Sequence, residues 1–451
     1  MVETLETERL WEVGLTAPSR LKNGAVNSLM PSDGPIHNWY TFVLSFPAHL
    51  VRQYLERFSV DRESCTLDPF CGTGTTPVEC KKHALPSIGV ESNPMAYFAS
   101  QTKVLWDIDA EAFLQDCDRI ARIAAEKAER AGLGEYDDLP LFGGEPQPAA
   151  LKDLSHDQWA VLSRAFISAK PLHRTLALLE TIRSGARKPW TNHQELAVAK
   201  SLVSGIGNVA FGPEIGATEP KADAPVVRLW LRECQRIGND LKHISPVCKR
   251  TPALVLQSDS RLPLPVSAKG VDFVITSPPY PNEKDYTRTT RLESVVLGFI
   301  QSRRDLRALK DGLLRSNTRN VFVSDEDDKW IKQFASVSLL AKQIEERRLA
   351  LGKTSGFERL YARVVLLYFG GMRRHFENLL PALRPGAKLA YVVGDQMSYF
   401  RIPIRTGQIL AEIAESLGYR VDGIDLWRTR LATVTKEWLR EEVVLLSAPT
   451  H

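Results

Sequence analysis

The sequence predicts an α/β fold with a doubly wound, mostly parallel sheet. Short apolar runs that read as strands alternate with helical stretches from residue 65 to the end of the chain. Two of these runs end in residues with distinctive chemistry: residues 65–68 lead into a Gly-rich turn, and residues 270–275 lead into Ser277. At 451 residues the chain is too long for one simple core, so we expect inserted segments or a second domain.

The composition is that of an ordinary globular protein, with 43% hydrophobic and 25% charged residues. No apolar run approaches the ~18 residues of a membrane-spanning helix, and residues 1–20 lack the apolar core of a signal peptide. The six cysteines form no Cys-x-x-Cys pair, which argues for reduced thiols and against a zinc site. We therefore expect a cytoplasmic protein without metal and without membrane contact.

The first chemical motif is a strand, a Gly-rich turn and a helix. Asp68 ends the strand, Gly72 and Gly74 form the turn, and a helical stretch follows at 77–83. A second strand, 87–90, ends at Glu91. Small residues let a backbone approach a ligand, and an acid at the end of the next strand can hold ribose hydroxyls. This spacing predicts a nucleoside-binding βαβ unit.

The second motif is the corner formed by residues 277–280. A buried apolar strand runs into Ser277, two prolines remove backbone donors, and Tyr280 follows at once. This pattern predicts a pocket for a flat ring with an exocyclic amino group. Acceptors such as the Ser277 hydroxyl and the carbonyl freed by Pro278 would localise the lone pair of that nitrogen, and Tyr280 would stack on a flipped base.

The segment after this corner is basic. Residues 284–319 hold nine basic and four acidic side chains. A solvated helix face and a phosphate-contacting surface are both compatible with this charge. We expect nucleic-acid contacts from the following residues: Lys284, Arg288, Arg291, Arg303 and Arg304.

The remaining chain completes the expected sheet around a helical insertion. Apolar periodicity predicts a short helix near 50–58 and helices near 109–132, 153–186, 192–211 and 226–243. Further along, strands are expected at 253–259, 388–395, 421–427 and 442–447, the last two as an antiparallel pair, with helices at 357–380 and 406–417.

These motifs resemble those of the amino-directed DNA methyltransferases, the N4-cytosine and N6-adenine enzymes that use S-adenosylmethionine. Residues 68–75 resemble their cofactor loop, Glu91 their ribose-binding acid, and 276–280 their catalytic motif. Residues 37–40 with 46–47 resemble the segment that helps to cradle the methionine part of the cofactor. The resemblance covers about residues 36–106 and 251–448 and implies a Rossmann-like class I methyltransferase sheet with no metal.

The resemblance also assigns roles to individual residues. The implied catalytic residues are Ser277, Pro278, Pro279 and Tyr280. The implied cofactor-binding residues are Trp39, Tyr40, Asp68, Pro69, Phe70, Gly72, Gly74, Thr75, Glu91 and Asp259. The implied domains are an N-terminal arm (1–30), a discontinuous catalytic domain (31–106 and 251–451), a helical insertion (107–250) and a candidate target-recognition insertion (284–356).

The expected activity is methyl transfer to the exocyclic amino group of a flipped base in double-stranded DNA, within a restriction–modification or similar defence system in the prokaryotic cytosol. Ser277 in the first motif position favours N4 of cytosine, with N6 of adenine as the alternative. We also consider an RNA amino-methyltransferase and a catalytically silent DNA-binding subunit with the same fold. A restriction endonuclease acting independently is compatible with the expected activity. Methylation of ring carbon C5 is rejected, because no Cys directly follows a Pro or lies near 277–280.

Overall fold

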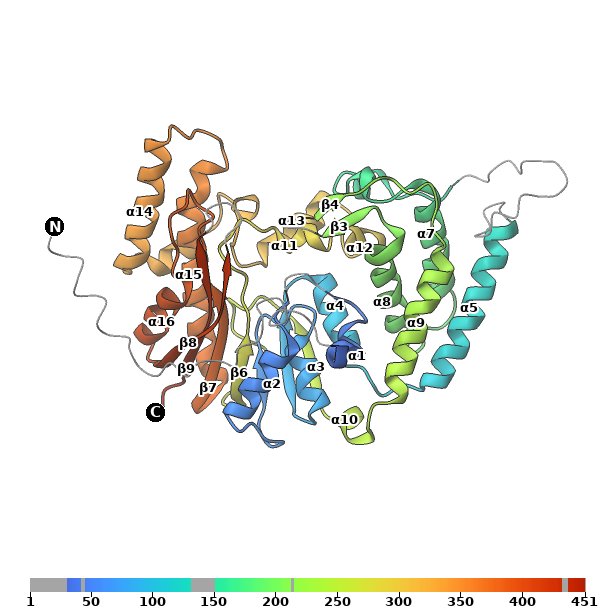
Figure 1. The fold of residues 1–451 in the computed structure, drawn as a ribbon, viewed down its shortest axis with the longest axis horizontal. Helices are drawn as coiled ribbons and strands as arrows, with labels where there is room; N and C mark the ends of the chain where they lie inside the picture. The colour runs from blue at the N-terminus through green and yellow to red at the C-terminus, as the bar shows by residue number, and fades with distance from the viewer. Residues whose placement is uncertain (1–30, 42–44, 131–150, 212–214, 432–436, 451) are drawn as a thin grey trace. The chain divides into compact units, whose positions relative to one another are not determined.

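The computed structural model describes residues 31–41, 45–130, 151–211, 215–431 and 437–450 (Figure 1). By contact, the chain forms two compact units, each discontinuous in sequence. The N-terminal unit comprises Pro31–Pro265 and Lys284–Leu314, and the C-terminal unit comprises Val266–Glu283 and Arg315–His451, within the described ranges. The expected arm, 1–30, lies outside the described residues. The predicted domains were defined by expected function, whereas these two units are defined by contacts within the chain. The predicted domain boundaries therefore stay a prediction.

The N-terminal unit is built on three parallel strands in the order β5-β2-β1. Strand β1 (Thr66–Asp68) pairs with β2 (Ser87–Glu91), and β2 pairs with β5 (Ala253–Gln257). Helix α3 (Thr75–Lys82) connects β1 to β2, and α4 (Pro94–Lys103) follows β2. All three strands therefore point the same way, and the predicted βαβ unit is present.

The ends of these helices follow from local sequence. Helix α3 begins directly after Gly74, whose left-handed backbone (φ 88°) turns the chain from the loop into the helix. Helix α4 begins at Pro94, and the side chain of Asn93 accepts hydrogen bonds from the amides of Met95 and Ala96. The Asn-Pro sequence after Glu91 thus starts a helix at the edge of the sheet.

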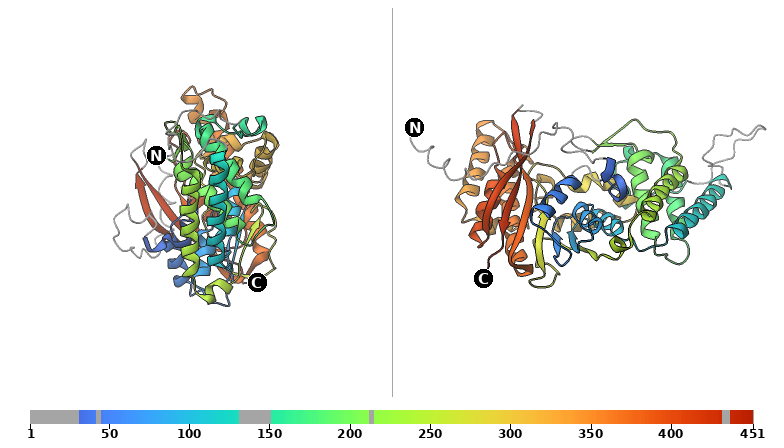
Figure 2. Two further views of the ribbon diagram at one scale, coloured as in Figure 1. Left: turned by 90° about the vertical axis from the view of Figure 1, so that its right-hand side faces the viewer. Right: turned by 60° about the horizontal axis from the view of Figure 1, so that its bottom comes forward.

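The described part of the predicted helical insertion contains long and short helices and one small hairpin. Figure 2 shows the two longest of these helices, α5 in cyan and α9 in yellow-green, side by side. Their contact buries Phe113, Cys117, Cys234 and Ile237 completely. The sequence predicts a helix that ends near residue 211, but a π-helical turn ends the helical run at Ile206. Residues Val209–Phe211 form strand β3 instead. The elements are α5 (Ala110–Arg130), α6 (His156–Trp159), η2 (Arg164–Phe166), α7 (Ala169–Arg183), α8 (Thr191–Ser201), η3 (Leu202–Ile206), β3 (Val209–Phe211), β4 (Ile215–Ala217), α9 (Val226–Lys242) and α10 (Pro246–Arg250).

Two further groups of elements belong to this unit. The segment before β1 holds η1 (Pro31–Asp33), α1 (Gly34–His37) and α2 (Ala48–Arg57). The segment after the 277–280 corner holds α11 (Tyr286–Thr289), α12 (Arg291–Val296) and α13 (Arg303–Asp311). The first part of the predicted target-recognition insertion therefore packs in the N-terminal unit.

The C-terminal unit holds four strands in the order β6-β7-β9-β8. Strands β6 and β7 are parallel, whereas β9 is antiparallel to both β7 and β8, as predicted for the last two strands. The red strands in the right view of Figure 2 are this antiparallel pair. The elements are β6 (Val271–Thr276), η4 (Thr318–Asn320), η5 (Asp327–Ile331), α14 (Ala335–Ala350), η6 (Glu358–Leu360), α15 (Tyr361–Leu379), η7 (Leu380–Ala382), β7 (Leu383–Gly394), α16 (Thr406–Ser416), β8 (Arg420–Leu431) and β9 (Trp438–Ser447).

The predicted fold class is confirmed. Strands and helices alternate in both units, and parallel pairing dominates apart from the last two strands. This mixed α/β architecture is consistent with a Rossmann-like methyltransferase fold. Among the described residues, no helix is both long and apolar enough to span a membrane.

Candidate active site

The predicted cofactor loop lies between β1 and α3. Asp68 is the last residue of β1, and its carboxylate accepts a hydrogen bond from the amide of Phe70 at 3.1 Å. The carbonyl of Pro69 accepts a hydrogen bond from the hydroxyl of Ser260. Thr75 is the buried first residue of α3. The loop is therefore fixed at both ends by its own strand and helix.

The two glycines of the loop have different surroundings. Both have positive φ, 53° at Gly72 and 88° at Gly74. A Cβ at Gly74 would lie 2.5 Å from Ser100 Oγ and 3.2 Å from Ser100 Cα, so this glycine lets the loop pack against α4. A Cβ at Gly72 would meet no atom of the described residues within 4 Å. Gly72 thus presents bare backbone to open space, as a loop that receives a ligand requires.

Glu91 is bonded to this loop. Its Oε2 accepts a hydrogen bond from the amide of Gly72 at 2.9 Å, and its Oε1 accepts one from the amide of Asn93 at 2.7 Å. Burial raises the pKa of Glu91 to about 7, although these two amides oppose the shift. A carboxylate has about four acceptor positions, so these amides leave acceptor capacity for a hydroxyl donor.

Asp259 follows β5 and is paired with a residue that sequence reasoning missed. The guanidinium of Arg261 donates to both carboxylate oxygens, at 3.0 Å to Oδ1 and 2.7 Å to Oδ2. The same guanidinium donates to the carbonyl of Asp311 at 2.7 Å. The sequence shows that Arg261 follows Asp259 by two residues, but it does not show the hydrogen bond from Arg261 to the carbonyl of Asp311.

Trp39 and Tyr40 are buried, and their polar atoms bond to distant helices. The indole Nε1 of Trp39 donates to Asp240 Oδ2 at 2.8 Å. The hydroxyl of Tyr40 donates to Glu293 Oε1. These bonds hold the 37–40 segment in place, and a direct role in cofactor binding stays a prediction for both residues.

The segment is also held from its first residue. His37 Nε2 lies 2.8 Å from Oε1 of Glu79, a fully buried acid on α3. Arg52 Nη1 and Lys82 Nζ reach the same carboxylate at 2.5 and 2.9 Å. Burial alone would raise the pKa of Glu79, but the hydrogen bond and charges of His37 and Lys82 outweigh it and lower the pKa to about 2. One carboxylate thus joins the 31–58 segment to the helix that follows the cofactor loop.

The predicted catalytic corner lies in the C-terminal unit, directly after the buried strand β6. Ser277, Pro279 and Tyr280 are partly exposed, and Pro278 is buried. The ring of Tyr280 packs at the carboxyl end of β7, where a Cβ at Gly394 would lie 3.2 Å from Tyr280 Cε2. The corner therefore stands at the edge of a parallel strand pair, the usual place of ligand sites in α/β sheets.

A short polar network follows the corner. Glu283 accepts hydrogen bonds from the amide and the hydroxyl of Thr318, at 3.0 and 2.8 Å. The amide of Glu283 donates to the carbonyl of Ser316 at 3.3 Å, and the hydroxyl of Tyr399 donates to the same carbonyl at 3.2 Å. These bonds fix the chain three residues beyond Tyr280.

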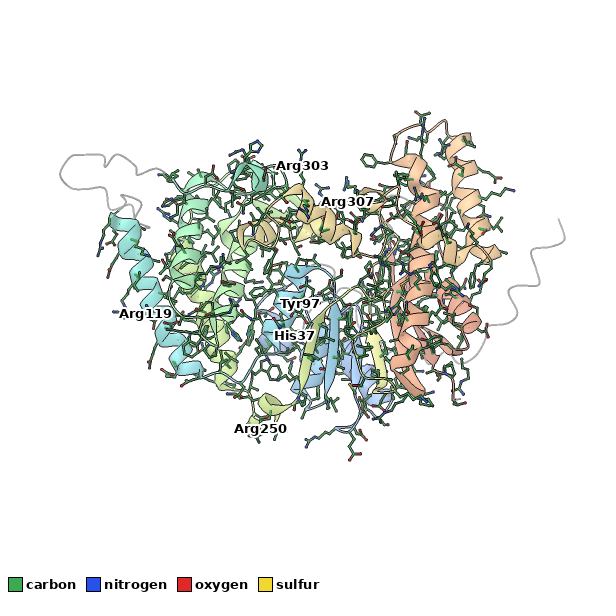
Figure 3. All side chains as sticks on the ribbon, turned by 180° about the vertical axis from the view of Figure 1, so that it is seen from behind. His37, Tyr97, Arg119, Arg250, Arg303 and Arg307 are labelled. Carbon is green, nitrogen blue, oxygen red and sulfur yellow. The ribbon has the colours of Figure 1, made fainter. Side chains whose placement is uncertain are left out.

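The predicted nucleic-acid residues fall into two groups. Arg291 is largely used inside the protein, because its guanidinium donates to Thr287 and to the carbonyl of Val161. Burial lowers the pKa of Arg291. Lys284 and Arg288 are partly buried. Arg303 and Arg304 are exposed at the start of α13, and Figure 3 labels Arg303 on the outer side of this helix.

The residues of the N-terminal unit fit the cofactor that the motifs imply. The open space in front of Gly72 would admit a ligand close to the backbone, and Glu91 has acceptor capacity for ribose hydroxyls. Among the residues described, no group of three or more His, Cys, Asp or Glu side chains could hold a metal ion.

The chain is similar to known DNA methyltransferases. A family model described as DNA methylase, for N6 and N4 methyltransferases, matches residues 4–101. The type II methyltransferase M.BsoBI of Geobacillus stearothermophilus is 27% identical over 415 residues, which cover 85% of this chain and 79% of that protein. The type II methyltransferases M.AvaI of Nostoc sp. and Anabaena variabilis are each 24% identical over 404 residues, which cover 86% of this chain and 80% of each relative.

The α/β fold and its Gly-rich loop are those of a Rossmann-like protein. The matched family model and these relatives support an amino-directed DNA methyltransferase. A methyltransferase of this kind implies S-adenosylmethionine as the cofactor. The matched model ends before residues 276–280, so the roles of the catalytic corner stay predictions.

Proposed function

We propose that this enzyme methylates N4 of cytosine in double-stranded DNA, as the modification enzyme of a restriction–modification system. The observation that carries the proposal is the corner at Ser277, which follows a strand buried at every position except Asp272 and has the aromatic ring of Tyr280 against the end of β7. The type II methyltransferase relatives support the setting in restriction–modification. The hydroxyl of Ser277, rather than a carboxylate or amide, favours cytosine over adenine.

In this proposal each residue of the corner has a distinct chemical task. Bound S-adenosylmethionine supplies an electrophilic methyl group. The Ser277 hydroxyl and the carbonyl freed by Pro278 accept hydrogen bonds from the two N–H groups of the base amino group and draw its lone pair out of conjugation with the ring. Tyr280 stacks on the flipped base and orients the amino nitrogen. No covalent bond between enzyme and base is needed, so positioning supplies most of the rate enhancement.

The N-terminal unit supplies the cofactor-binding residues. Glu91 holds the ribose hydroxyls, and the backbone at Gly72 lies against the ligand. Arg303 and Arg304 contact DNA phosphates from the exposed start of α13. The likeness to type II enzymes supports double-stranded DNA as the substrate, and a restriction endonuclease acting separately would complete the system.

The test is methyl transfer from labelled S-adenosylmethionine to DNA, followed by nucleoside analysis. We expect N4-methylcytosine from the wild type. Ser277→Ala and Tyr280→Ala should each lose transfer by about 100-fold or more while they keep their affinity for S-adenosylhomocysteine. N6-methyladenine as the product would overturn the choice of base, and methylation of RNA alone would overturn the choice of substrate. Cofactor binding without transfer to any nucleic acid would identify a regulatory subunit.

A further inference from the structure

Glu293 on α12 is a fully buried acid with half of its carboxylate unused. Its Oε1 accepts a hydrogen bond from the hydroxyl of Tyr40. Its Oε2 is buried and has no hydrogen-bond partner in the part of the chain that the structure describes. An unsatisfied buried acceptor costs about 1–3 kcal/mol, so native proteins seldom leave one without a reason.

Two other buried acids of the same unit, Glu79 and Glu233, differ from Glu293 in one respect. Glu79 is paired with Arg52 and Lys82, and Glu233 is paired with Arg232 and Arg236 at 3.1 and 2.6 Å. No cation lies within ion-pair distance of Glu293 among the described residues, and its one donor is a neutral phenol. Burial accordingly raises the pKa of Glu293 to about 7. The missing partner of this carboxylate is a cation.

The position of Glu293 indicates where such a cation would come from. Thr290, the N-cap residue of α12, lies three residues earlier, and its hydroxyl accepts a hydrogen bond from Asn93 Nδ2 at 3.3 Å. The amide of Asn93 donates to Glu91, the predicted ribose-binding acid. Tyr40 belongs to the segment predicted to cradle the methionine part of the cofactor. Glu293 therefore contacts one predicted cofactor-binding residue, Tyr40, and follows Thr290, which is linked through Asn93 to another, Glu91.

We propose that Oε2 of Glu293 binds the α-ammonium group of the methionine part of S-adenosylmethionine. An ammonium group brings both the charge and the N–H donor that this carboxylate lacks. The inference rests on the proposed use of S-adenosylmethionine and adds a residue that reads its amino-acid part. Glu293 is then a specificity-determining residue, which distinguishes the full cofactor from simpler adenosine thioethers.

The experiment compares two ligands by calorimetry on Glu293→Gln and the wild type. S-adenosylhomocysteine and methylthioadenosine share the adenosine and the thioether, but only the former carries the amino-acid part. We expect Glu293→Gln to weaken S-adenosylhomocysteine about 10- to 100-fold, the range for a charge-assisted hydrogen bond, and to leave methylthioadenosine unchanged. Glu233→Gln is the matched control: it alters a buried acid with its own arginines and should not change the ratio of the two affinities.

A second measurement needs no variant. Protons and the ammonium group compete for Glu293, so the wild-type preference for S-adenosylhomocysteine over methylthioadenosine should fall as the pH falls from 8 to 6. Tyr40 is the one titratable group within hydrogen-bond distance of Glu293 among the described residues, and burial raises its pKa well above this range. Glu91 affects both ligands, because both carry the ribose, and its effect therefore cancels in the ratio.

The outcomes separate the inference from the proposed function. Equal weakening of both ligands in Glu293→Gln would show a structural role, and unchanged affinities would show no contact; either result overturns the inference alone. A wild type that binds neither ligand overturns the proposed cofactor and the inference together. A wild type that shows the ligand preference but methylates no DNA overturns the proposed function and leaves Glu293 as an ammonium-binding residue.

Discussion

Alanine substitutions at Gly72 and Gly74 should produce different defects. Gly74→Ala should mainly lower the stability of the protein, whereas Gly72→Ala should mainly lower its affinity for the cofactor. A non-glycine residue in the left-handed region costs roughly 1–2 kcal/mol, and both positions carry this cost. At Gly74 the new Cβ would also meet Ser100, with the Cα of that residue only 3.2 Å away. Overpacking adds about 1–3 kcal/mol. Gly74→Ala should therefore destabilise the protein by about 2–5 kcal/mol.

Gly72→Ala should cost only about 1–2 kcal/mol of stability, since its Cβ would point into open space. If the cofactor fills that space, the methyl group will weaken S-adenosylhomocysteine by tenfold or more. Urea unfolding reports the stability and calorimetry the affinity. Gly185→Ala is the matched control, because Gly185 also has a positive φ (94°) and no neighbour within 4 Å, but lies between α7 and α8. Normal affinity in Gly72→Ala, or equal destabilisation at Gly72 and Gly74, would refute the distinction between the two glycines.

Three further predictions follow from the charged residues. Burial raises the pKa of Glu91 to about 7, and hydrogen bonds from ribose hydroxyls favour its ionised form. The affinity for methylthioadenosine should therefore fall about tenfold from pH 8 to pH 6. In Glu91→Gln this pH dependence should be absent. Glu79→Gln should destabilise the protein by about 3–5 kcal/mol at pH 7. The folded pKa of Glu79, about 2, lies below its ordinary value of 4.5, so the stability that Glu79 adds is present above pH 4.5 and is lost as the pH falls toward 2. Urea unfolding should therefore show the free energies of unfolding of wild type and variant becoming equal as the pH approaches 2. Arg303→Ala combined with Arg304→Ala should reduce the slope of log affinity for DNA against log salt by about 2, and an unchanged slope would remove both residues from the phosphate contacts.

Local sequence signals were sufficient for the parts of the fold that local chemistry determines. The strand, turn and helix around Gly74 were predicted because glycine spacing and apolar runs act within a few residues. The antiparallel pair β8 and β9 was predicted for the same reason. The start of α4 at Pro94 also has a local cause, the cap at Asn93.

Contacts between distant parts of the chain could not be predicted in this way. Tyr40 bonds to Glu293, 253 positions away, and Trp39 bonds to Asp240, 201 positions away. Within the run Leu292 to Val296, Glu293 looks like a polar interruption of an apolar helix face. Only the folded chain shows that it is buried beside a tyrosine rather than exposed.

Two adjacent residues, Ser92 and Asn93, hold both ends of the 291–311 part of the basic segment. Asn93 holds Thr290, and the hydroxyl of Ser92 donates to the carbonyl of Gly312 at 2.7 Å. The residues from 291 to 311 thus leave and return to a single point beside Glu91, with the exposed start of α13 between the two attachments. Doubling the length of a flexible loop costs only about 0.6 kcal/mol once its ends are fixed. Related enzymes could therefore lengthen, shorten or replace this excursion, and so acquire new DNA contacts, while the chain beside Glu91 keeps its conformation.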